Sequence, residues 1–229
     1  MTDKTTLLPQ AAVVKLLDFA ATLPLIIWFT WNCGQLVIAV IVEGHLFFAE
    51  PHWTLGLRIV NQAMAIIFFV FQIVLFALRP VAKQKSQGIV PRLAAIFTVA
   101  LGLLYFYAPL AESEDLVQGL AALFGILGLS LAIYSLLSLG RSFSILPEAR
   151  ILVTHGPYRI VRHPLYAAEA LSTLGITLQL AQPLGILIAI AIFLGQFARM
   201  GFEEKVLSRS FPEYAIYKER TFRLIPYVY

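Results

Sequence analysis

The sequence predicts an all-α integral membrane protein with about six transmembrane helices and with both chain ends on the cytosolic side. Hydrophobic residues make up 59% of its 229 residues and charged residues only 13%, whereas soluble domains carry about 25% charged residues. The mean hydropathy is +0.82, and the apolar residues fall in long runs separated by short polar linkers. This composition disfavours the alternative of a very apolar soluble core.

Six apolar runs have about the length of 20 residues that a membrane span requires. They are Ala11–Trp31, Leu57–Leu78, Leu93–Leu110, Leu116–Leu139, Pro164–Ala181 and Leu184–Phe202. A further apolar run, Leu36–Phe48, is short and is interrupted by Glu43 and His45. We expect this run to continue the first helix beyond a kink at Asn32-Cys33-Gly34, or to lie along the membrane interface, rather than to form a seventh span.

The charged residues test this topology. With the first residues placed in the cytosol, all but Arg58 of the 17 Lys and Arg residues fall on the cytosolic side. The outer loops instead hold acidic residues, namely Glu43, Glu50, Glu112, Glu114 and Asp115. This asymmetry follows the positive-inside rule. The basic sequence pI of 9.3 is explained by it, so no nucleic acid partner is expected.

The start of the chain does not resemble a cleaved signal peptide. Met1–Gln10 is polar, and no small-residue cleavage site follows a short apolar core, so the first span is expected to remain as an anchor. Cys33 is the single cysteine, which excludes internal disulfides and cysteine-based metal sites. We expect one membrane domain over 1–229, with N-terminal spans in 1–135 and the catalytic region in 136–229.

The polar segments of the second half are predicted to meet at the cytosolic face. Pro183 indicates a tight turn between the last two spans, because proline disfavours helix in the residue before it. Those spans therefore form an antiparallel hairpin whose two ends emerge on the same side. Gly140–His163 and Glu203–Tyr229 are the polar segments at these ends.

A first candidate site lies in Gly156–Tyr166, which combines two arginines, a histidine and two tyrosines next to an apolar run. Pro164 suits the first turn of a helix, so Arg162 and His163 fall at the positive end of that helix. A helix start with these side chains attracts an anionic group. Headgroup binding or membrane orientation alone explains Arg159.

A second candidate site is formed by Arg199, Glu203 and Glu204. Arg199 and Glu203 are four residues apart and share a helix face. A buried arginine needs a partner, which Glu203 or a ligand carboxylate can provide; a surface pair that anchors the helix is the alternative. The following pattern of apolar residues reads as a helix on the lipid headgroups: Leu207, Phe211, Tyr214 and Tyr217.

These motifs resemble one known family. They are Leu139-Gly140-Arg141-Ser142-Phe143, Leu152-Val153-Thr154-x-Gly156-Pro157-Tyr158-x-x-x-Arg162-His163-Pro164-x-Tyr166 and Glu203-Glu204-x-x-Leu207-x-x-x-Phe211-Pro212-x-Tyr214-x-x-Tyr217, followed by Pro226. Together they are similar to the isoprenylcysteine carboxyl methyltransferase family over about residues 135–229. The first 110 residues show only compatible hydropathy, and Pro212 stands where the family commonly has glycine.

The resemblance implies an integral membrane methyltransferase that uses S-adenosylmethionine. The cofactor is expected in a pocket closed by the C-terminal segment, beside a lipid-facing tunnel for the substrate. The positions that match cofactor contacts are Glu148, Leu152, Val153, Tyr158, His163, Pro164, Leu165, Tyr166 and Glu203. Arg199 matches the arginine that addresses the substrate carboxylate, and Arg162 and Glu204 complete the expected catalytic set.

The methyl acceptor is left open by the sequence. A carboxylate is already ionised at pH 7 and needs no general base, whereas an amine or thiol would call on His163 or Glu204. We expect a lipophilic or prenylated substrate, contact with membrane lipids and a bacterial cytoplasmic membrane. The alternatives are an NADPH-dependent membrane reductase of related fold and a non-enzymatic lipid-binding protein. Oligomeric state is also left open.

Overall fold

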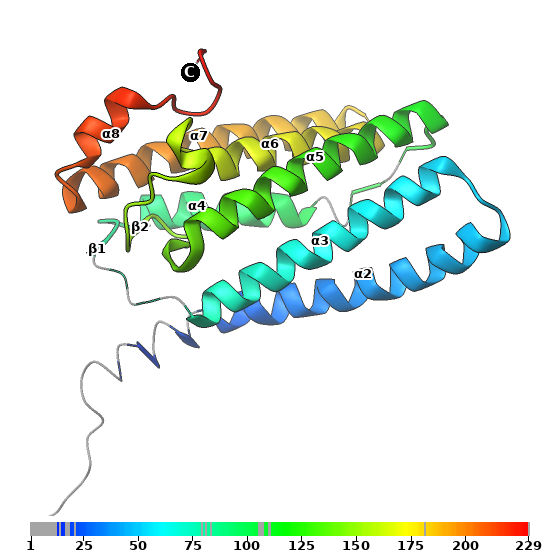
Figure 1. Ribbon diagram of the computed structural model, residues 1–229, viewed down its shortest axis with the longest axis horizontal. Coiled ribbons are helices and arrows are strands. Elements are labelled where there is room, and N and C mark those ends of the chain that lie inside the picture. The colour runs from blue at the N-terminus through cyan, green and yellow to red at the C-terminus, as the bar shows by residue number, and fades with distance from the viewer. Residues whose placement is uncertain are drawn as a thin grey trace, which may run out of the picture.

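The computed structural model describes residues 22–78, 84–104, 111–180 and 182–228, together with positions 13, 15, 16, 19, 20, 80, 82, 108 and 109. Within these residues the chain is a bundle of roughly parallel helices, with short irregular segments gathered at one end (Figure 1). Three of the basic residues that support the predicted topology, Lys4, Arg79 and Lys83, lie outside the described residues.

Six helices form the bundle: α2 (Leu23–Ala49), α3 (Trp53–Leu78), α4 (Val90–Leu104), α5 (Asp115–Leu139), α6 (Pro164–Gln179) and α7 (Leu184–Ser210). Four of them, α2, α3, α5 and α7, are long and apolar enough to cross a membrane. The other two are shorter, with 15 residues in α4 and 16 in α6, and lie packed among the long ones. The predicted all-α integral membrane fold is confirmed.

The first helix differs from the predicted span at its beginning and its end. Instead of Ala11–Trp31 followed by a kink, α2 runs unbroken from Leu23 to Ala49. Asn32 does not break the helix because its amide donates to the Trp28 carbonyl oxygen of the same helix, at 2.8 Å. The expectation that Leu36–Phe48 continues the first helix is therefore confirmed. Of the predicted beginning, positions 13, 15, 16, 19 and 20 are helical and Thr22 lies in a turn, whereas positions 11, 12, 14, 17, 18 and 21 lie outside the described residues.

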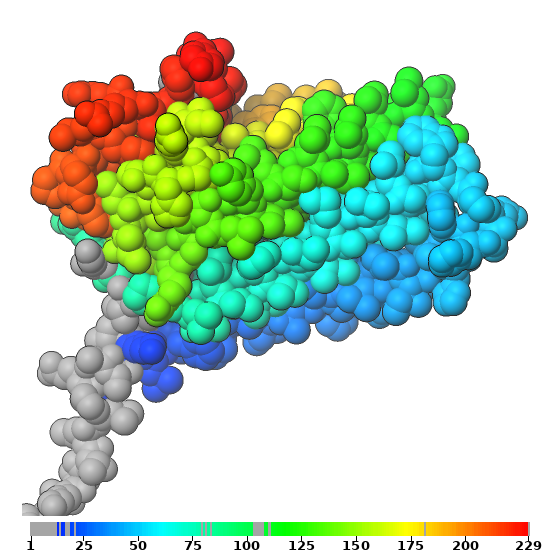
Figure 2. Space-filling view, viewed as in Figure 1, coloured from blue at the N-terminus to red at the C-terminus, as the bar shows by residue number. Residues whose placement is uncertain are grey.

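The outer faces of the long helices are apolar and exposed. In the apolar stretch of α2 only 6% of the residues are buried. Ile27 and Trp31 of this helix are each 67% exposed. Figure 2 shows one such face, built from α2, α3 and α5. An apolar surface of this extent is stable against hydrocarbon and not against water, so these faces contact lipid.

Close packing of α5 against α6 depends on glycine. A Cβ added at Gly128 of α5 would lie 2.3 Å from the Ser172 hydroxyl and 2.7 Å from its backbone nitrogen. A Cβ added at Gly175 of α6 would lie 2.6 Å from the Ala121 carbonyl oxygen. Small residues of this kind let membrane helices approach closely, and they fix α6 in place beside α5.

The irregular segments at one end of the bundle place the site. They are the 3₁₀ turns η1 (Gly140–Ser142) and η2 (Gly156–Arg159), the strands β1 (Gln84–Lys85) and β2 (Glu148–Ala149), and helix α8 (Tyr214–Arg220). The strands pair antiparallel. Gly156 has a φ of +61°, which confirms the predicted turn. The predicted hairpin is also present, because α6 and α7 pack on each other and are joined at Pro183.

Candidate active site

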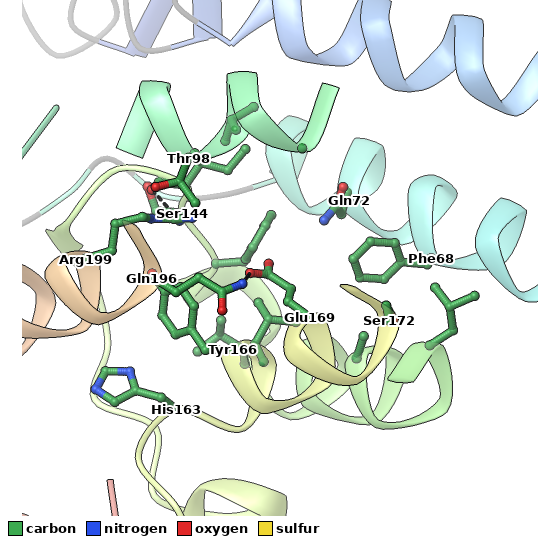
Figure 3. Close-up of a pocket in the computed structure, with 18 of the residues that line it drawn as sticks. Phe68, Gln72, Thr98, Ser144, His163, Tyr166, Glu169, Ser172, Gln196 and Arg199 are labelled. Carbon is green, nitrogen blue, oxygen red and sulfur yellow. Dashed lines mark hydrogen bonds between the residues drawn. The ribbon is translucent and has the colours of Figure 1, made fainter. Parts of the chain in front are cut away.

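A cavity of about 510 Å³ begins at the end of the bundle that holds the irregular segments and extends between the helices. Its polar end is lined by the loops that surround η2, by the C-terminal half of α7 and by α8. Its other part, the membrane arm, is lined by residues of α2, α3, α4, α5 and α6. Figure 3 shows how side chains from α3, α4, α6 and α7 converge on one space.

Ten of the twelve predicted site residues line this cavity: Glu148, Leu152, Val153, Tyr158, Arg162, His163, Leu165, Tyr166, Arg199 and Glu203. The remaining two lie beside it. Pro164 is buried in the first turn of α6, the position predicted for it. Glu204 points to an ion-pair cluster next to the cavity. The fold thus brings together two motifs that are about 40 residues apart in sequence.

Tyr166 links the two predicted clusters. Its hydroxyl donates to Glu203 Oε1, and its ring lies 5.1 Å from the Arg199 guanidinium carbon. Arg199 is 7% exposed and donates to the Ile145 carbonyl oxygen at 3.1 Å. The spacing of four residues therefore places Arg199 and Glu203 on the same side of α7, and Tyr166 lies against both.

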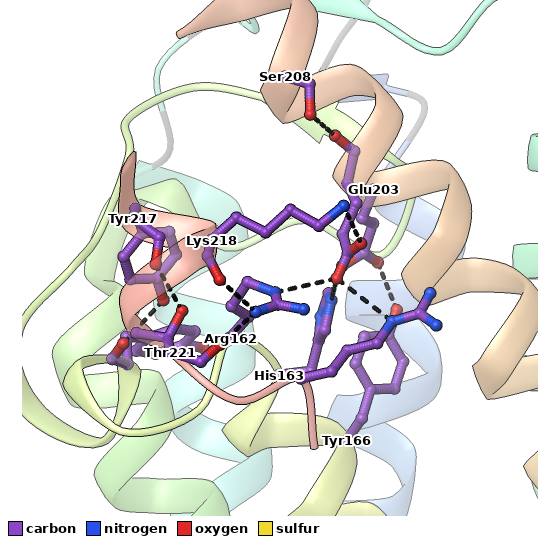
Figure 4. Close-up of polar contacts among 11 residues, drawn as sticks. Arg162, His163, Tyr166, Glu203, Ser208, Tyr217, Lys218 and Thr221 are labelled. Carbon is purple, nitrogen blue, oxygen red and sulfur yellow. Dashed lines mark hydrogen bonds and ion pairs between the residues drawn. The ribbon is translucent and has the colours of Figure 1, made fainter. Parts of the chain in front are cut away.

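Glu204 is the centre of an ion-pair cluster. One of its oxygens lies 3.1 Å from Arg162 Nε, 3.1 Å from His163 Nε2 and 3.2 Å from Arg223 Nε. The other oxygen lies 3.9 Å from Lys218 Nζ. Figure 4 shows these contacts between α7, the start of α6 and the C-terminal segment. With four basic neighbours, Glu204 holds the segments together, and its predicted catalytic role stays a prediction.

Backbone hydrogen bonds attach the C-terminal segment to the loop before α6. Arg162 N donates to the Phe222 carbonyl oxygen at 2.8 Å, and Phe222 N donates to the Ile160 carbonyl oxygen at 3.0 Å. The Tyr217 hydroxyl donates to the Tyr158 carbonyl oxygen at 2.7 Å. The segment therefore covers the polar end of the cavity, as the family resemblance implies.

The amphipathic pattern after Glu204 does not form a helix on the headgroups. The helix α7 continues to Ser210, and α8 then turns its apolar side toward the protein. Tyr214 is 1% exposed and packs with Phe211 against Val206 and Ala149. The prediction of a headgroup helix was wrong. A helix with one apolar side can pack that side against protein as well as against lipid, and here it packs against β2 and α7.

The tyrosines of the polar end stay protonated. Burial raises the pKa of Tyr158, and the negative charge of Glu203 raises it further. Burial likewise raises the pKa of Tyr214 and of Tyr217. These phenols are therefore neutral hydrogen-bond donors at physiological pH. Among the described residues the Tyr214 hydroxyl has no hydrogen-bond partner, although it is buried.

The polar residues of the cavity that are absent from the predicted site include Glu169, Gln196 and Gln72. Glu169 of α6 accepts a hydrogen bond from Gln196 of α7 at 3.0 Å, and Gln72 of α3 lines the membrane arm. Glu169 carries a signal that the sequence contains, because it is the single charged residue in the predicted span Pro164–Ala181. An ionisable residue inside a span is a functional candidate by default. The amides of Gln72 and Gln196 carry no comparable signal.

The chain is similar to known membrane methyltransferases in part of its sequence and in its fold. Residues 117–214 match the family model described as phospholipid methyltransferase. The chain superposes on the structure of the eukaryotic intramembrane Ras methyltransferase ICMT (isoprenylcysteine carboxyl methyltransferase) with a TM-score of 0.54 and 19% sequence identity. That match covers 95% of this chain and 86% of the other. A likeness at this level of identity shows a shared fold.

Curated relatives cover shorter stretches. Protein-S-isoprenylcysteine O-methyltransferase A of Arabidopsis thaliana is 32% identical over 102 residues, 41% of this chain and 51% of that protein. The cobalt-zinc-cadmium resistance protein CzcN of Cupriavidus metallidurans is 35% identical over 117 residues, 48% of this chain and 51% of that protein. The chain thus spans about half the length of these relatives. Within its described residues no group of three or more His, Cys, Asp or Glu side chains is arranged to hold a metal ion.

The fold defines a multi-pass membrane protein, and residues 117–214 of it resemble phospholipid methyltransferases. The chain is similar to the isoprenylcysteine carboxyl methyltransferases in its fold and, over 102 residues, in its sequence.

Proposed function

We propose that the protein transfers a methyl group from S-adenosylmethionine to a lipophilic acceptor at the membrane. The observation that carries this proposal is the continuity of the cavity. One space joins a polar end, which holds both predicted clusters, to an arm enclosed by membrane helices. A water-soluble cofactor and a lipid-soluble acceptor can therefore meet without either one leaving its own phase. The excess of basic residues on this face favours a cytosol-facing site in a bacterial cytoplasmic membrane.

The side chains of the polar end suit this cofactor. Glu203 places a carboxylate beside the cavity, where it complements the positive charges of the sulfonium and amino groups. Glu148 also lines the cavity, with its carboxylate paired to Arg150 at 2.6 Å and to Lys85 at 3.6 Å. The buried Tyr214 hydroxyl, which lacks a partner among the described residues, is available to a ligand atom. Leu152 and Val153 provide an apolar wall. When bound, the cofactor supplies an electrophilic methyl group on its sulfonium.

We further propose that Arg199 orients an acceptor carboxylate, giving a methyl ester. Its buried Nε has no hydrogen-bond partner within the described part of the chain, while one terminal nitrogen is held by Ile145. A buried guanidinium with an open donor suits a carboxylate oxygen. The ionised acceptor then needs no proton removed, so the protein contributes positioning and the exclusion of water.

The experiment that tests the cofactor is calorimetry on the purified full-length protein in nanodiscs, with S-adenosylmethionine compared against NADPH. We expect binding of S-adenosylmethionine alone. Glu203→Gln should weaken that binding roughly ten- to a hundredfold, because it removes a charge-assisted contact of about 1.5–3 kcal/mol. Glu213→Gln is the matched control, since Glu213 is an exposed carboxylate before α8. Binding of NADPH alone would overturn the proposal in favour of a reductase.

A further inference from the structure

The membrane arm of the cavity is not uniformly apolar. One stripe of α3 faces it, formed by Asn61, Ala65, Phe68 and Gln72, all of which line the cavity. Their spacings of four, three and four residues place them on one face of the helix. The stripe therefore begins and ends with an amide side chain. A purely hydrocarbon tail could form a hydrogen bond with neither amide.

Three amides of α3 line the cavity, Asn61, Gln62 and Gln72, and Oε1 of Gln62 has no hydrogen-bond partner among the described residues. Gln72 is the most informative of the three because it is the most buried. It is 6% exposed, and its Oε1 has no hydrogen-bond partner among the residues that the structure describes. A buried amide left without a partner costs about 1–3 kcal/mol, and leucine would fill a similar volume without that cost. The amide is therefore explained by something in the cavity that donates a hydrogen bond to it.

Glu169 enters the same cavity from α6 (Figure 3). One of its carboxylate oxygens accepts from Gln196 Nε2 at 3.0 Å, and the other oxygen has capacity to accept from a ligand. Arg199 is close enough to interact electrostatically with Glu169, so a second cation beside Glu169 would be repelled. Both Gln72 and Glu169 thus favour a neutral donor group.

We infer that the membrane arm recognises hydroxyl groups carried on the apolar chain of the methyl acceptor, one of which donates to Gln72 and another to Glu169. This inference rests on the proposed function, whose substrate class it narrows from any lipophilic carboxylate to a hydroxylated one. A plain isoprenoid or acyl chain leaves both acceptors unsatisfied. A hydroxylated chain satisfies them inside the low-dielectric membrane, where an unmade hydrogen bond is most costly.

The test measures binding rather than turnover. Palmitic acid derivatives that carry one hydroxyl at stepped positions along the chain are titrated into the full-length protein in nanodiscs without cofactor, each beside its methyl ether. The ether keeps the chain and the oxygen but cannot donate. We expect one position facing Gln72 and one facing Glu169 at which the alcohol binds roughly three- to tenfold more tightly than its ether, in line with the net worth of one hydrogen bond.

Variants assign that preference to residues. Gln72→Leu should bring the ratio of ether to alcohol dissociation constants close to 1 at the position facing Gln72, and Glu169→Met should do so at the position facing Glu169. Glu169→Gln, which keeps an amide oxygen, should retain the preference. Ser130→Ala is the matched control, because Ser130 is exposed on α5 and bonds only to the Ile126 carbonyl oxygen of its own helix. Equal binding of every alcohol and its ether by the parent protein would overturn the inference, and so would a preference that survives both apolar variants.

The two proposals fail separately. Calorimetry with S-adenosylmethionine decides the methyltransferase proposal without any acceptor, and the alcohol–ether comparison decides the hydroxyl site without any cofactor. If the protein prefers alcohols but does not bind S-adenosylmethionine, the hydroxyl site stands and the methyltransferase proposal fails. If it binds S-adenosylmethionine but shows no preference for alcohols, the methyltransferase proposal stands and the hydroxyl site fails.

Discussion

Arg199 illustrates how a charged residue is kept next to the bilayer interior. The Tyr166 ring lies 5.1 Å from its guanidinium carbon, and the Ile145 carbonyl oxygen accepts from one nitrogen. The carboxylates of Glu169 and Glu203 are close enough to interact with its positive charge, and its Nε, which has no hydrogen-bond partner among the described residues, is the donor that an anionic ligand can use. The sequence could indicate that Arg199 needs a partner, but not that Tyr166 and Ile145 would be its neighbours, because those contacts depend on how α6 and α7 pack.

The carboxylate role of Arg199 is tested by Arg199→Lys. Lysine keeps the charge but cannot form two parallel hydrogen bonds to a carboxylate or stack as a plane on Tyr166. We expect turnover of a carboxylate acceptor to fall roughly ten- to a hundredfold, as the loss of about 1.5–3 kcal/mol implies. Cofactor affinity should stay unchanged, and Arg209→Lys on the exposed end of α7 should have no effect. Parental turnover in Arg199→Lys would refute the carboxylate clamp.

The role of Glu204 in holding the C-terminal segment is tested by Glu204→Gln. The variant leaves Arg162, Lys218 and Arg223 without their shared carboxylate, which is 12% exposed. Breaking a buried ion pair from one side costs about 3–5 kcal/mol, so the melting temperature should fall and the C-terminal segment should become sensitive to protease. Glu213→Gln should change neither. If Glu204→Gln melts like the parent but loses turnover, Glu204 is catalytic instead.

At the scale of elements, hydrophobic periodicity could predict that helices exist and roughly where they lie, because lipid-facing segments must be continuous apolar helices. Hydrophobic periodicity could not predict where α2 ends. The Asn32 amide donates a hydrogen bond to a carbonyl oxygen of its own helix, so this polar residue does not interrupt the helix. Periodicity also could not distinguish whether the apolar side of α8 meets lipid or protein. The apolar side of α8 packs against Ala149, which is distant from α8 in the sequence, and against Val206, which belongs to the preceding helix α7.

The α5–α6 contact gives a prediction for this scale. Gly128→Ala should destabilise the protein by about 1–3 kcal/mol, the usual cost of overpacking, because the new methyl group would lie 2.7 Å from the Ser172 backbone nitrogen. Thermal unfolding in detergent measures the effect. Gly34→Ala in α2 is the control, since a Cβ there meets nothing within 4 Å. Equal melting temperatures for the two variants would show that α5 and α6 are not held at this distance.

At the scale of the whole molecule, ordered motifs in the last hundred residues predicted the polar end of the cavity well. Ten of the twelve residues expected there line it. The membrane arm was not predicted. Gln72 comes from a helix that shows only hydropathy in the sequence, whereas Glu169 carries a signal, as the single charged residue of its predicted span, that the motifs did not include. Their meeting depends on which faces of α3 and α6 turn inward, and that is decided by packing.

The last prediction concerns the orientation of the molecule. In a Cys33→Ala background, a cysteine introduced at Glu114 should react with an impermeant thiol reagent on intact cells, and a cysteine at Lys85 should not. The physical reason is the basic asymmetry, which keeps the end with Lys85, β2 and α8 in the cytosol. Both positions are exposed in the protein, so both should react once the membrane is permeabilised, and this step controls for accessibility. Reaction at Lys85 alone on intact cells would place the candidate site outside the cytosol, where S-adenosylmethionine made inside the cell could not reach it.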